Sequence, residues 1–341
     1  MHLYEMMKIV ISNSSTIMNV LYILGNGFDK AQGMKTSYPE FYEYLKTIDP
    51  SKESSLLKKM KQEIKADTAL WSDMEEALGK FTESIISVQE FEDFYYELSN
   101  HLQDHLNNEN NQFTPSEKLK TKFQNDFLAI SKYLGDLDKP RFTSFSNTIS
   151  GGKDISVISL NYTNTLEKLL SLGSNNSKSF GSSQTLSNII HVHGILNDSI
   201  ILGVNDSSQI ANNDLRDDDD IKDFMIKLQS NQCMKSTRHL KCAELIANAH
   251  CIILYGVSLG DTDAHWWKLI GEQLIRRKSL CIIQHVYAPK AIEPTKKHLM
   301  GRIERKQQNL LLQKMRIDKK DVSDELKNRL FFIVNAPIFT V

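Results

Sequence analysis

Short, uninterrupted runs of hydrophobic residues recur along this chain and predict the strands of a parallel β-sheet. The runs occupy residues 19–24, 155–160, 188–193, 251–255, 280–287 and 331–334. They show no polar alternation, which is typical of strands buried on both faces of a parallel sheet. Helical patterns separate several of the runs, so we expect an α/β protein.

The long block between the first two runs shows the period of helices instead. Hydrophobic residues recur there at three- to four-residue steps with one longer gap: Met74, Leu78, Phe81, Ile85, Phe91, Phe94, Leu98, Leu102, Leu106, and then Leu119, Phe123, Phe127, Ile130 and Leu134. Such stripes bury one face of a helix, and we interpret both as packing surfaces rather than as a cofactor site. The polar stretches 107–116 and 173–187 are expected to be loops.

These patterns divide the chain into an extension and three structural parts. The parts are an α/β core (18–50 and 151–290), a helical insertion (51–150), and a C-terminal helix and strand (291–341). Residues 1–17 are expected to be an N-terminal extension because Met18 directly precedes the first strand. The extension lacks the long apolar core and the cleavage site of a secretory signal.

Composition excludes several classes of protein. The chain has 41 Lys and Arg against 42 Asp and Glu, which argues against a nucleic-acid-coating protein or a polybasic membrane anchor. No apolar run reaches the roughly 18 residues that span a bilayer. The four cysteines form no C-x-x-C pair. We therefore expect reduced thiols, a cytoplasmic location and no bound metal.

A glycine-containing segment directly follows the first predicted strand. Its residues are Gly25, Asn26, Gly27, Phe28 and Asp29. Glycines allow a close backbone approach to a phosphate, and exposed N–H groups at a helix start favour an anion. The dinucleotide fingerprint would need a third glycine where Lys30 stands, so a plain tight turn remains the alternative.

Amide and hydroxyl side chains follow the second predicted strand. Asn161 and Tyr162 stand at its carboxyl end, followed by Thr163 and Asn164. Such groups can hold sugar hydroxyls or orient a water molecule. The alternative is that they cap the helix expected over 165–172. Both interpretations hold together if Asn161 faces a cleft while Thr163 or Asn164 caps.

Two histidines mark the end of the third predicted strand. Alternation places His191 and His193 on one face of that strand, and Gly194 ends it. A histidine at this position can act as a general base near neutral pH. A structural histidine is the alternative, and a metal pair is disfavoured because no third ligand stands nearby.

A fourth segment follows the strand at 251–255. Gly256 and Ser258 can approach a ribose or a phosphate, while Asp261 or Asp263 is expected to cap the next helix. All four segments stand at carboxyl ends of predicted strands. Because open α/β sheets bind ligands beyond these ends, one cleft can collect them.

Together these segments resemble the AbiH family of bacteriophage abortive-infection proteins. The similar stretches are LYILGNGFDKAQGMKTSYPEFYEYL, SLNYTNTLEKL, IIHVHGILND with IILGVND, and ILYGVSLGDTDAHWW, in this order. AbiH proteins are in turn similar to the sirtuin, or SIR2-like, fold. That similarity implies a Rossmann-like, mostly parallel sheet that binds NAD and carries an inserted helical subdomain.

The resemblance also implies roles for individual residues. Asn161 matches the active-site asparagine of sirtuins and His193 their catalytic histidine. The residues it implies for binding NAD are Gly25, Asn26, Gly27, Phe28, Asp29, Tyr162, Gly194, Gly256, Ser258 and Asp261. The zinc-binding cysteine pairs of protein deacylases are missing, which disfavours peptide deacylation.

The function so implied is antiviral defence through hydrolysis of NAD to nicotinamide and ADP-ribose on infection. Asn161 would position the reactants, His193 would act as the base, and a phage-derived trigger and a homo-oligomer are expected. The alternative from another class is a sensor or adaptor that binds a nucleotide or a phage component without catalysis. A nuclease is less favoured because we find neither a clustered carboxylate metal site nor a basic stripe with interleaved aromatic residues, and the run Asp217–Asp220 is expected to be a solvated turn.

Overall fold

The computed structural model describes residues 17–149, 151–173, 176–289 and 294–340. Within these residues one sheet of seven strands has the order β3-β4-β2-β1-β5-β6-β7. The strands are β1 (Met18–Leu24), β2 (Lys153–Ser159), β3 (Lys178–Phe180), β4 (Gln184–His191), β5 (Cys251–Tyr255), β6 (Cys281–Val286) and β7 (Leu330–Val334). All neighbours pair in parallel except β3 with β4. The expected mixed α/β fold with a mostly parallel sheet is confirmed.

All six predicted strands are present, and β3 is the one that the pattern missed. The stretch 173–187 was expected to be a loop, but Lys178–Phe180 pairs antiparallel with the start of β4. Hydrophobic patterning did not predict β3, because its residues are mostly polar. A strand at the edge of a sheet is half exposed and needs no hydrophobic run.

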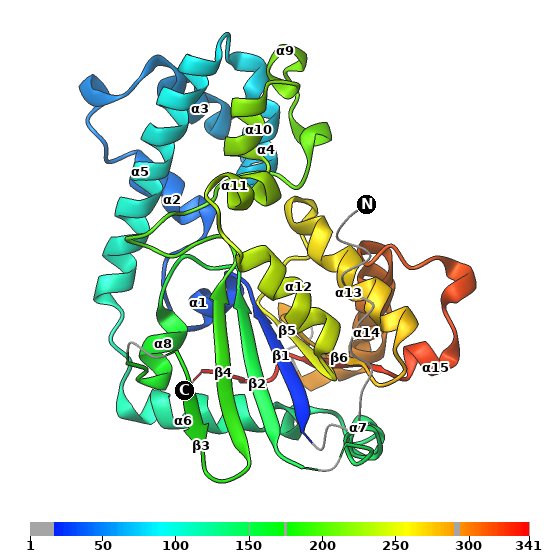
Figure 1. Cartoon of the computed structure of the whole chain (residues 1–341). Helices are drawn as coiled ribbons and strands as arrows, with labels where there is room; N and C mark the ends of the chain where they lie inside the picture. The colour runs from blue at the N-terminus through cyan, green and yellow to red at the C-terminus, as the bar shows by residue number, and fades with distance from the viewer. Residues whose placement is uncertain (1–16, 150, 174–175, 290–293, 341) are drawn as a thin grey trace.

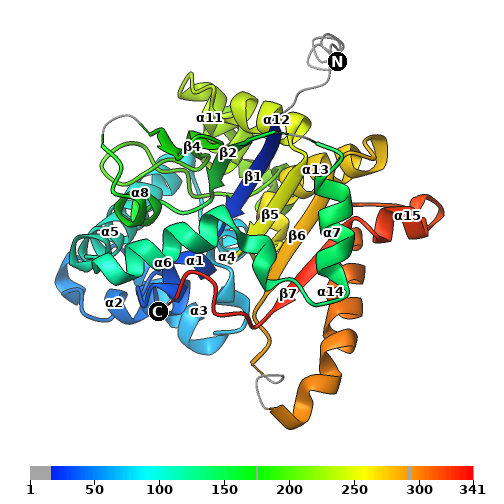
Figure 2. The ribbon, with the colours of Figure 1, turned by 90° about the horizontal axis from the view of Figure 1, so that it is seen from below.

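Each face of the sheet has its own hydrophobic core. On β1, Val20 and Tyr22 point to one core and Leu21 and Ile23 to the other. Figure 2 shows α6 and α7 on one side of the strands and α12 and α13 on the other. The helices over the two faces are α6 (Glu117–Leu128), α7 (Asp138–Ser146) and α8 (Thr165–Leu170), and α12 (Arg238–Asn248), α13 (Ala264–Arg276) and α14 (Met300–Lys314).

A third core lies beyond the carboxyl ends of the strands, in a group of helices that we call the helical module (Figure 1). Its helices are α2 (Tyr38–Leu45), α3 (Ser55–Ala66), α4 (Met74–Phe81), α5 (Val88–Gln112), α9 (Asn213–Arg216), α10 (Asp219–Met225) and α11 (Lys227–Cys233). Residues 51–150 therefore contribute to two cores, since α6 packs on the sheet and α3–α5 pack in the module. The remaining helices are α1 (Gly27–Ala31) and α15 (Asp324–Lys327), with 3₁₀ turns at Pro50–Lys52, Leu70–Ser72, Thr82–Ser84, Ile130–Tyr133, Ser207–Gln209, Asp261–Asp263, Pro294–Leu299 and Lys319–Asp321.

The two predicted hydrophobic stripes face these cores. Every stripe residue from Met74 to Leu106 is buried, and of the second stripe only Leu119 is partly exposed. The predicted loop at 107–116 is wrong for its first half, because α5 continues to Gln112. Tertiary contacts fix this last stretch of helix: Glu109 accepts a hydrogen bond from the backbone N–H of Lys35, and the carbonyl of Asn110 accepts one from Lys168.

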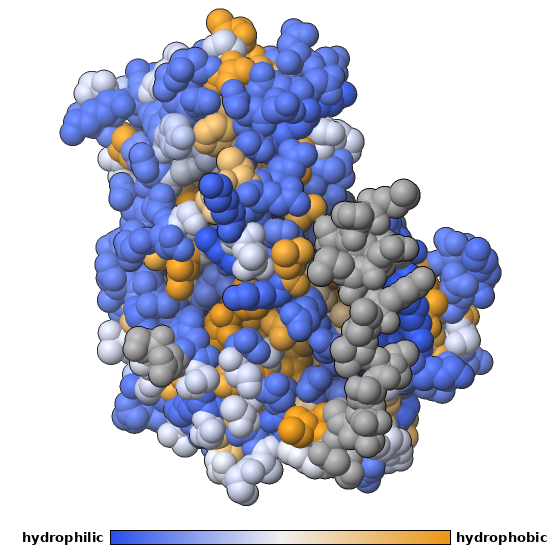
Figure 3. All heavy atoms as spheres, in the orientation of Figure 1, coloured by the Kyte–Doolittle hydropathy of each residue, from blue (hydrophilic) through white to orange (hydrophobic). Residues whose placement is uncertain are grey.

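The boundaries of the expected parts stay predictions. Residues 1–16, most of the expected extension, lie outside the described residues, as do 150 and 290–293. In the described part of the chain, no helix combines the length and hydrophobicity needed to cross a bilayer. On the face shown in Figure 3, hydrophilic residues predominate over the helical module, and hydrophobic residues gather over the strands.

A buried carboxylate ties the C-terminal segment to the sheet. Asp126 on α6, with 1% of its side chain exposed, lies 2.7 Å from Nζ of Lys122 and 2.8 Å from Nζ of Lys132. The backbone N–H of Phe339 donates to the same carboxylate at 2.9 Å. Burial alone would raise the pKa of Asp126, but the two lysines and the Phe339 N–H outweigh it, so the pKa lies below its usual range.

We expect Asp126→Asn to lower the free energy of unfolding by roughly 1–3 kcal/mol at pH 7, because the charge-assisted hydrogen bonds weaken. A carboxyl whose folded pKa is depressed stabilises the fold above its unfolded pKa and loses this effect as pH falls through the folded value. The difference between variant and wild type should therefore shrink below about pH 4. Urea unfolding from pH 7 to pH 3 measures it, with Asp136→Asn, a fully exposed side chain, as the control. An unchanged difference at pH 3 would contradict this account.

Candidate functional site

The carboxyl ends of the central strands open into one large cleft below the helical module. Its volume is about 1560 Å³, above the roughly 300–1,000 Å³ of pockets for drug-sized ligands. The chain order of the strands reverses at β1, which lies between β2 and β5. Open α/β sheets bind ligands at such a reversal. The α/β core and the helical module both line the cleft.

The loops after β1 and β5 pack backbone against backbone at the floor of this cleft. The N–H of Gly25 donates to the carbonyl of Tyr255 at 3.0 Å, and that of Gly27 to the carbonyl of Gly256 at 2.9 Å. Gly256 has a φ of +67°, and a Cβ there would lie 2.4 Å from the nitrogen of Phe28. Because they lack a Cβ, these glycines allow the two loops to touch. The N–H groups of Gly25 and Gly27, which were expected to face a phosphate, donate to protein carbonyls instead.

Asp29 is a buried acid on the first turn beyond this loop. Only 1% of it is exposed, and its Oδ2 accepts a hydrogen bond from the hydroxyl of Thr163 at 2.6 Å. Its Oδ1 is buried and has no hydrogen-bond partner among the described residues. Burial raises the pKa of Asp29 to about 6, against the lowering effect of the Thr163 hydrogen bond. The cleft thus holds a carboxyl that titrates close to neutral pH.

Asn161 links the β1 loop to the end of β2. Its side-chain amide donates to the carbonyl of Gly25 at 3.2 Å, and its backbone carbonyl lies 2.8 Å from Nδ1 of His191. The other ring nitrogen of His191 lies 2.9 Å from Glu167. Burial works against protonation of His191, but Glu167 more than compensates, so its pKa is raised. His191 therefore supports the loop that carries Asn161.

The two histidines do not form a pair. β4 ends at His191, so the alternation expected to place both side chains on one face does not extend to His193. Nε2 of His193 lies 2.9 Å from Oδ1 of Asp263 instead. No group of three His, Cys, Asp or Glu side chains within the described residues is arranged to hold a metal ion.

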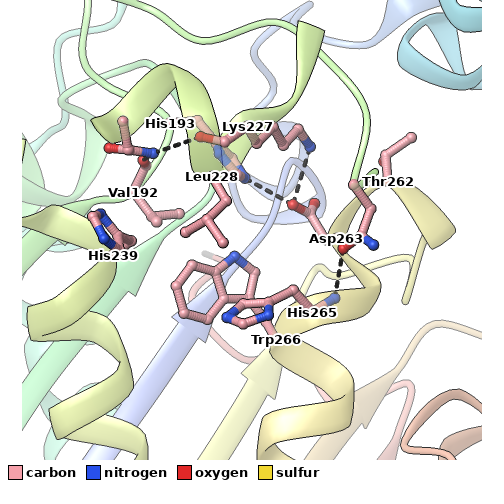
Figure 4. A pocket seen from close by; sticks show the side chains of 11 residues that line it. Val192, His193, Lys227, Leu228, His239, Thr262, Asp263, His265 and Trp266 are labelled. Carbon is pink, nitrogen blue, oxygen red and sulfur yellow. Dashed lines mark hydrogen bonds and ion pairs between the residues drawn. The ribbon is translucent and has the colours of Figure 1, made fainter. Parts of the chain in front are cut away.

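A buried lysine completes this second cluster. Nζ of Lys227 lies 2.7 Å from Glu75 and 3.0 Å from Asp263, with both the Lys227 and the Glu75 side chains 8% exposed. Figure 4 shows Lys227 and His193 converging on Asp263. Glu75 belongs to α4, Lys227 begins α11, and Asp263 precedes α13. The cluster therefore joins the helical module to the α/β core beside the cleft.

Burial and the Lys227 charge set the protonation states in this cluster. Burial lowers the pKa of His193, and Lys227 lowers it further, so the ring is neutral at pH 7. Burial would raise the pKa of Asp263, but the Lys227 ammonium holds it well below its usual range. Burial raises the pKa of Glu75, which shares the single ammonium with Asp263. The cleft thus presents a neutral imidazole beside a fixed carboxylate.

The structure brings most of the predicted site residues together, but not all of them. Those that line the cleft are Gly25, Asn26, Gly27, Asp29, Asn161, Tyr162, His193, Gly256 and Ser258. Phe28 packs into a core of the sheet, and Gly194 approaches the carbonyl of Ser199. The exposed Asp261 pairs with Lys314 at 2.7 Å. These three residues lie outside the cleft lining.

The expected helix caps are wrong. Asn164 and Asp263 precede α8 and α13 without a side-chain capping hydrogen bond. The hydroxyl of Thr163 donates to Asp29, and the carboxylate of Asp263 accepts from Lys227. These side chains therefore bond distant residues instead of the N–H groups at the start of a helix. The sequence reasoning missed Lys227 and Glu75 altogether. A lysine inside the apolar stretch from Met225 to Leu228 was the one available signal, since a charge in such a run is buried only with a partner.

Fold and site define an α/β protein with a large cleft at the strand ends and a buried acid–base cluster in its wall. The chain belongs to the bacteriophage abortive infection AbiH family, whose model matches residues 21–285. The family resemblance found in the sequence is thereby confirmed. No curated protein matches the chain.

The raised pKa of Asp29 predicts how stability depends on pH. Between about pH 4 and pH 6 the folded protein keeps a proton that the unfolded chain releases, so the free energy of unfolding falls as pH rises. We expect Asp29→Asn to remove this decline, with a gain over wild type that grows across this window to at most about 3 kcal/mol. Chemical unfolding at pH 4, 5, 6 and 7 measures it. The exposed Asp214→Asn is the control, and parallel curves for wild type and Asp29→Asn would refute the prediction.

Proposed function

We propose that this protein acts in abortive infection by hydrolysing NAD to nicotinamide and ADP-ribose. The observation that carries the proposal is that Asn161 and His193, from the ends of two different strands, line one cleft with the loops at Gly25–Gly27 and Gly256. Without the edge strand β3, the order of the sheet is that of dinucleotide-binding Rossmann sheets. The cleft volume also suits a ligand of two nucleotides.

The chemistry requires a positioned water and a base. The bond between the ribose carbon and the nicotinamide nitrogen breaks through an oxocarbenium-like state, as in other glycosidic cleavages. Nicotinamide leaves with the bonding electron pair as a neutral molecule, because its ring nitrogen is cationic before cleavage. Water then supplies the new C–O bond, and a base takes its proton. The neutral imidazole of His193 is suited to accept that proton, and Asn161 to position the reactants.

The charges along the cleft are compatible with this ligand. Lys30 lines the cleft beside the Gly25–Gly27 loop and offers a cation to the pyrophosphate. The unpartnered Oδ1 of Asp29 can accept a hydrogen bond from a ribose hydroxyl. Ser258, after β5, lines the same cleft and can bond the ribose of the other nucleotide. A cytoplasmic location follows from the proposal, since the NAD pool that it depletes is cytoplasmic.

We expect His193→Ala and Asn161→Ala each to reduce NAD consumption by about 10²–10⁴-fold, the range that positioned acid–base groups contribute. Mass spectrometry of NAD and ADP-ribose in cells before and after phage challenge measures this. Measurement in cells keeps any activating trigger in place. His101→Ala, on α5 outside the cleft lining, is the matched control and should deplete NAD like wild type.

Two results would redirect the proposal. If phage resistance requires Asn161 and His193 while NAD stays constant, hydrolysis of NAD is wrong and the cleft acts as a sensor or on another substrate. Thermal unfolding of the purified protein with NAD separates these outcomes. A raised Tm without NAD consumption favours a nucleotide sensor, because a ligand that binds only the folded state stabilises it.

A further inference from the structure

A second, much smaller cavity lies beside His193. Its volume is about 20 Å³, and His193, Asn231, His239 and His265 are among the residues that line it. His193, Lys227 and Asp263 line both this cavity and the large cleft. In Figure 4, His239 lies across the small cavity from Asp263. His193 therefore stands between the two spaces.

Three of these side chains place unpaired polar atoms in this region. Both ring nitrogens of His193, Oδ1 of Asn231 and Nδ1 of His239 are buried without a hydrogen-bond partner among the described residues. His193 remains within ion-pair distance of Asp263, but in an orientation unsuited to a hydrogen bond. A buried polar atom left unpaired costs about 1–3 kcal/mol, so several such atoms around one cavity indicate a common partner.

The chemistry of the lining defines that partner. The amide nitrogen of Asn231 donates to the carbonyls of Lys227 at 3.0 Å and of Val192 at 3.4 Å, so its Oδ1 needs a donor from the cavity. A simple anion such as chloride has no hydrogen to give, and a larger oxyanion exceeds the volume of about 20 Å³. A metal ion is disfavoured too, because no three His, Cys, Asp or Glu side chains of the described residues are arranged to hold one. A neutral molecule that both donates and accepts remains, and the volume suits one water.

We propose that a single ordered water binds here, donating to Oδ1 of Asn231 and bridging the rings of His193 and His239. Asn231 and His239 are then positioning residues for His193, since they hold the water that holds the imidazole. A water can donate to one ring and accept from the other, so it fits whichever nitrogen of His193 carries the proton. The water site does not depend on the proposal that NAD is hydrolysed, whereas the catalytic role of the water rests on that proposal.

A crystal structure of the full chain at high resolution tests the water directly. One density peak is expected within hydrogen-bond distance of His193, Asn231 and His239, without anomalous scattering. A metal ion at this position, or a cavity without density, would overturn the proposal.

Variants of the cavity histidines test the coupling to His193. His239→Phe keeps a ring but removes the water's partner, and His239→Asn restores a polar group near the position of Nδ1. His265→Phe is the matched control, because His265 lines the same cavity and its ring has no buried unpaired nitrogen among the described residues. Long-range ¹H–¹⁵N NMR of the histidine rings reports the tautomer and the pKa of His193.

We expect His239→Phe to lower the pKa of His193 by at least about half a unit, because the protonated ring loses a well-held acceptor. His239→Asn should recover most of this shift, and His265→Phe should leave the His193 titration unchanged. Equal shifts in both Phe variants would indicate a general packing effect and overturn the coupling. In NAD assays, His239→Phe should lower kcat about tenfold with little change in KM. Because NMR needs no substrate, it decides on the coupling of His239 to His193 even if NAD is not hydrolysed.

Discussion

The buried ammonium of Lys227 is the interaction on which the site depends. It lies between Glu75 of the helical module and Asp263 of the α/β core, with none of the three side chains more than 15% exposed. Removing one partner of such a pair leaves an uncompensated buried charge, a change that costs about 3–5 kcal/mol. This charge cluster therefore links the helical module to the strand ends, and His193 contacts the cluster through Asp263.

Burial gives the acids and bases of the cleft different protonation states. Asp29 has a pKa raised to about 6, because burial outweighs the lowering effects of the Thr163 hydrogen bond and of His191. Asp263, beside Lys227, stays ionised. His193 stays neutral because burial and Lys227 both oppose its protonation. Titratable groups with strongly shifted pKa values are typical of functional sites. Here the differences between the pKa values depend on which side chains the helical module brings to the strand ends.

Local patterns predicted the elements whose hydrophobic residues form a continuous run or a helical stripe. Six strands and both helical stripes follow from hydrophobic spacing, because burial of a continuous face needs a continuous apolar pattern. The pattern failed where structure depends on a distant partner. The hairpin strand β3 is polar at the sheet edge, and α5 runs past its apolar stripe because Lys35 and Lys168 bond its last turn.

The sequence by itself determined the sheet, its helical coverage, the AbiH resemblance and the four segments at the strand ends, because strand direction alone brings those ends to one edge. Tertiary structure decided which atoms face the cleft. It placed Phe28 in the core and paired Thr163 with Asp29 rather than with a helix end. It also paired Glu75 with Lys227, 152 residues away in the chain, beside His193. The physical reason is that hydrophobic spacing is local, whereas the partners of buried charges are set by how the helices pack over the sheet.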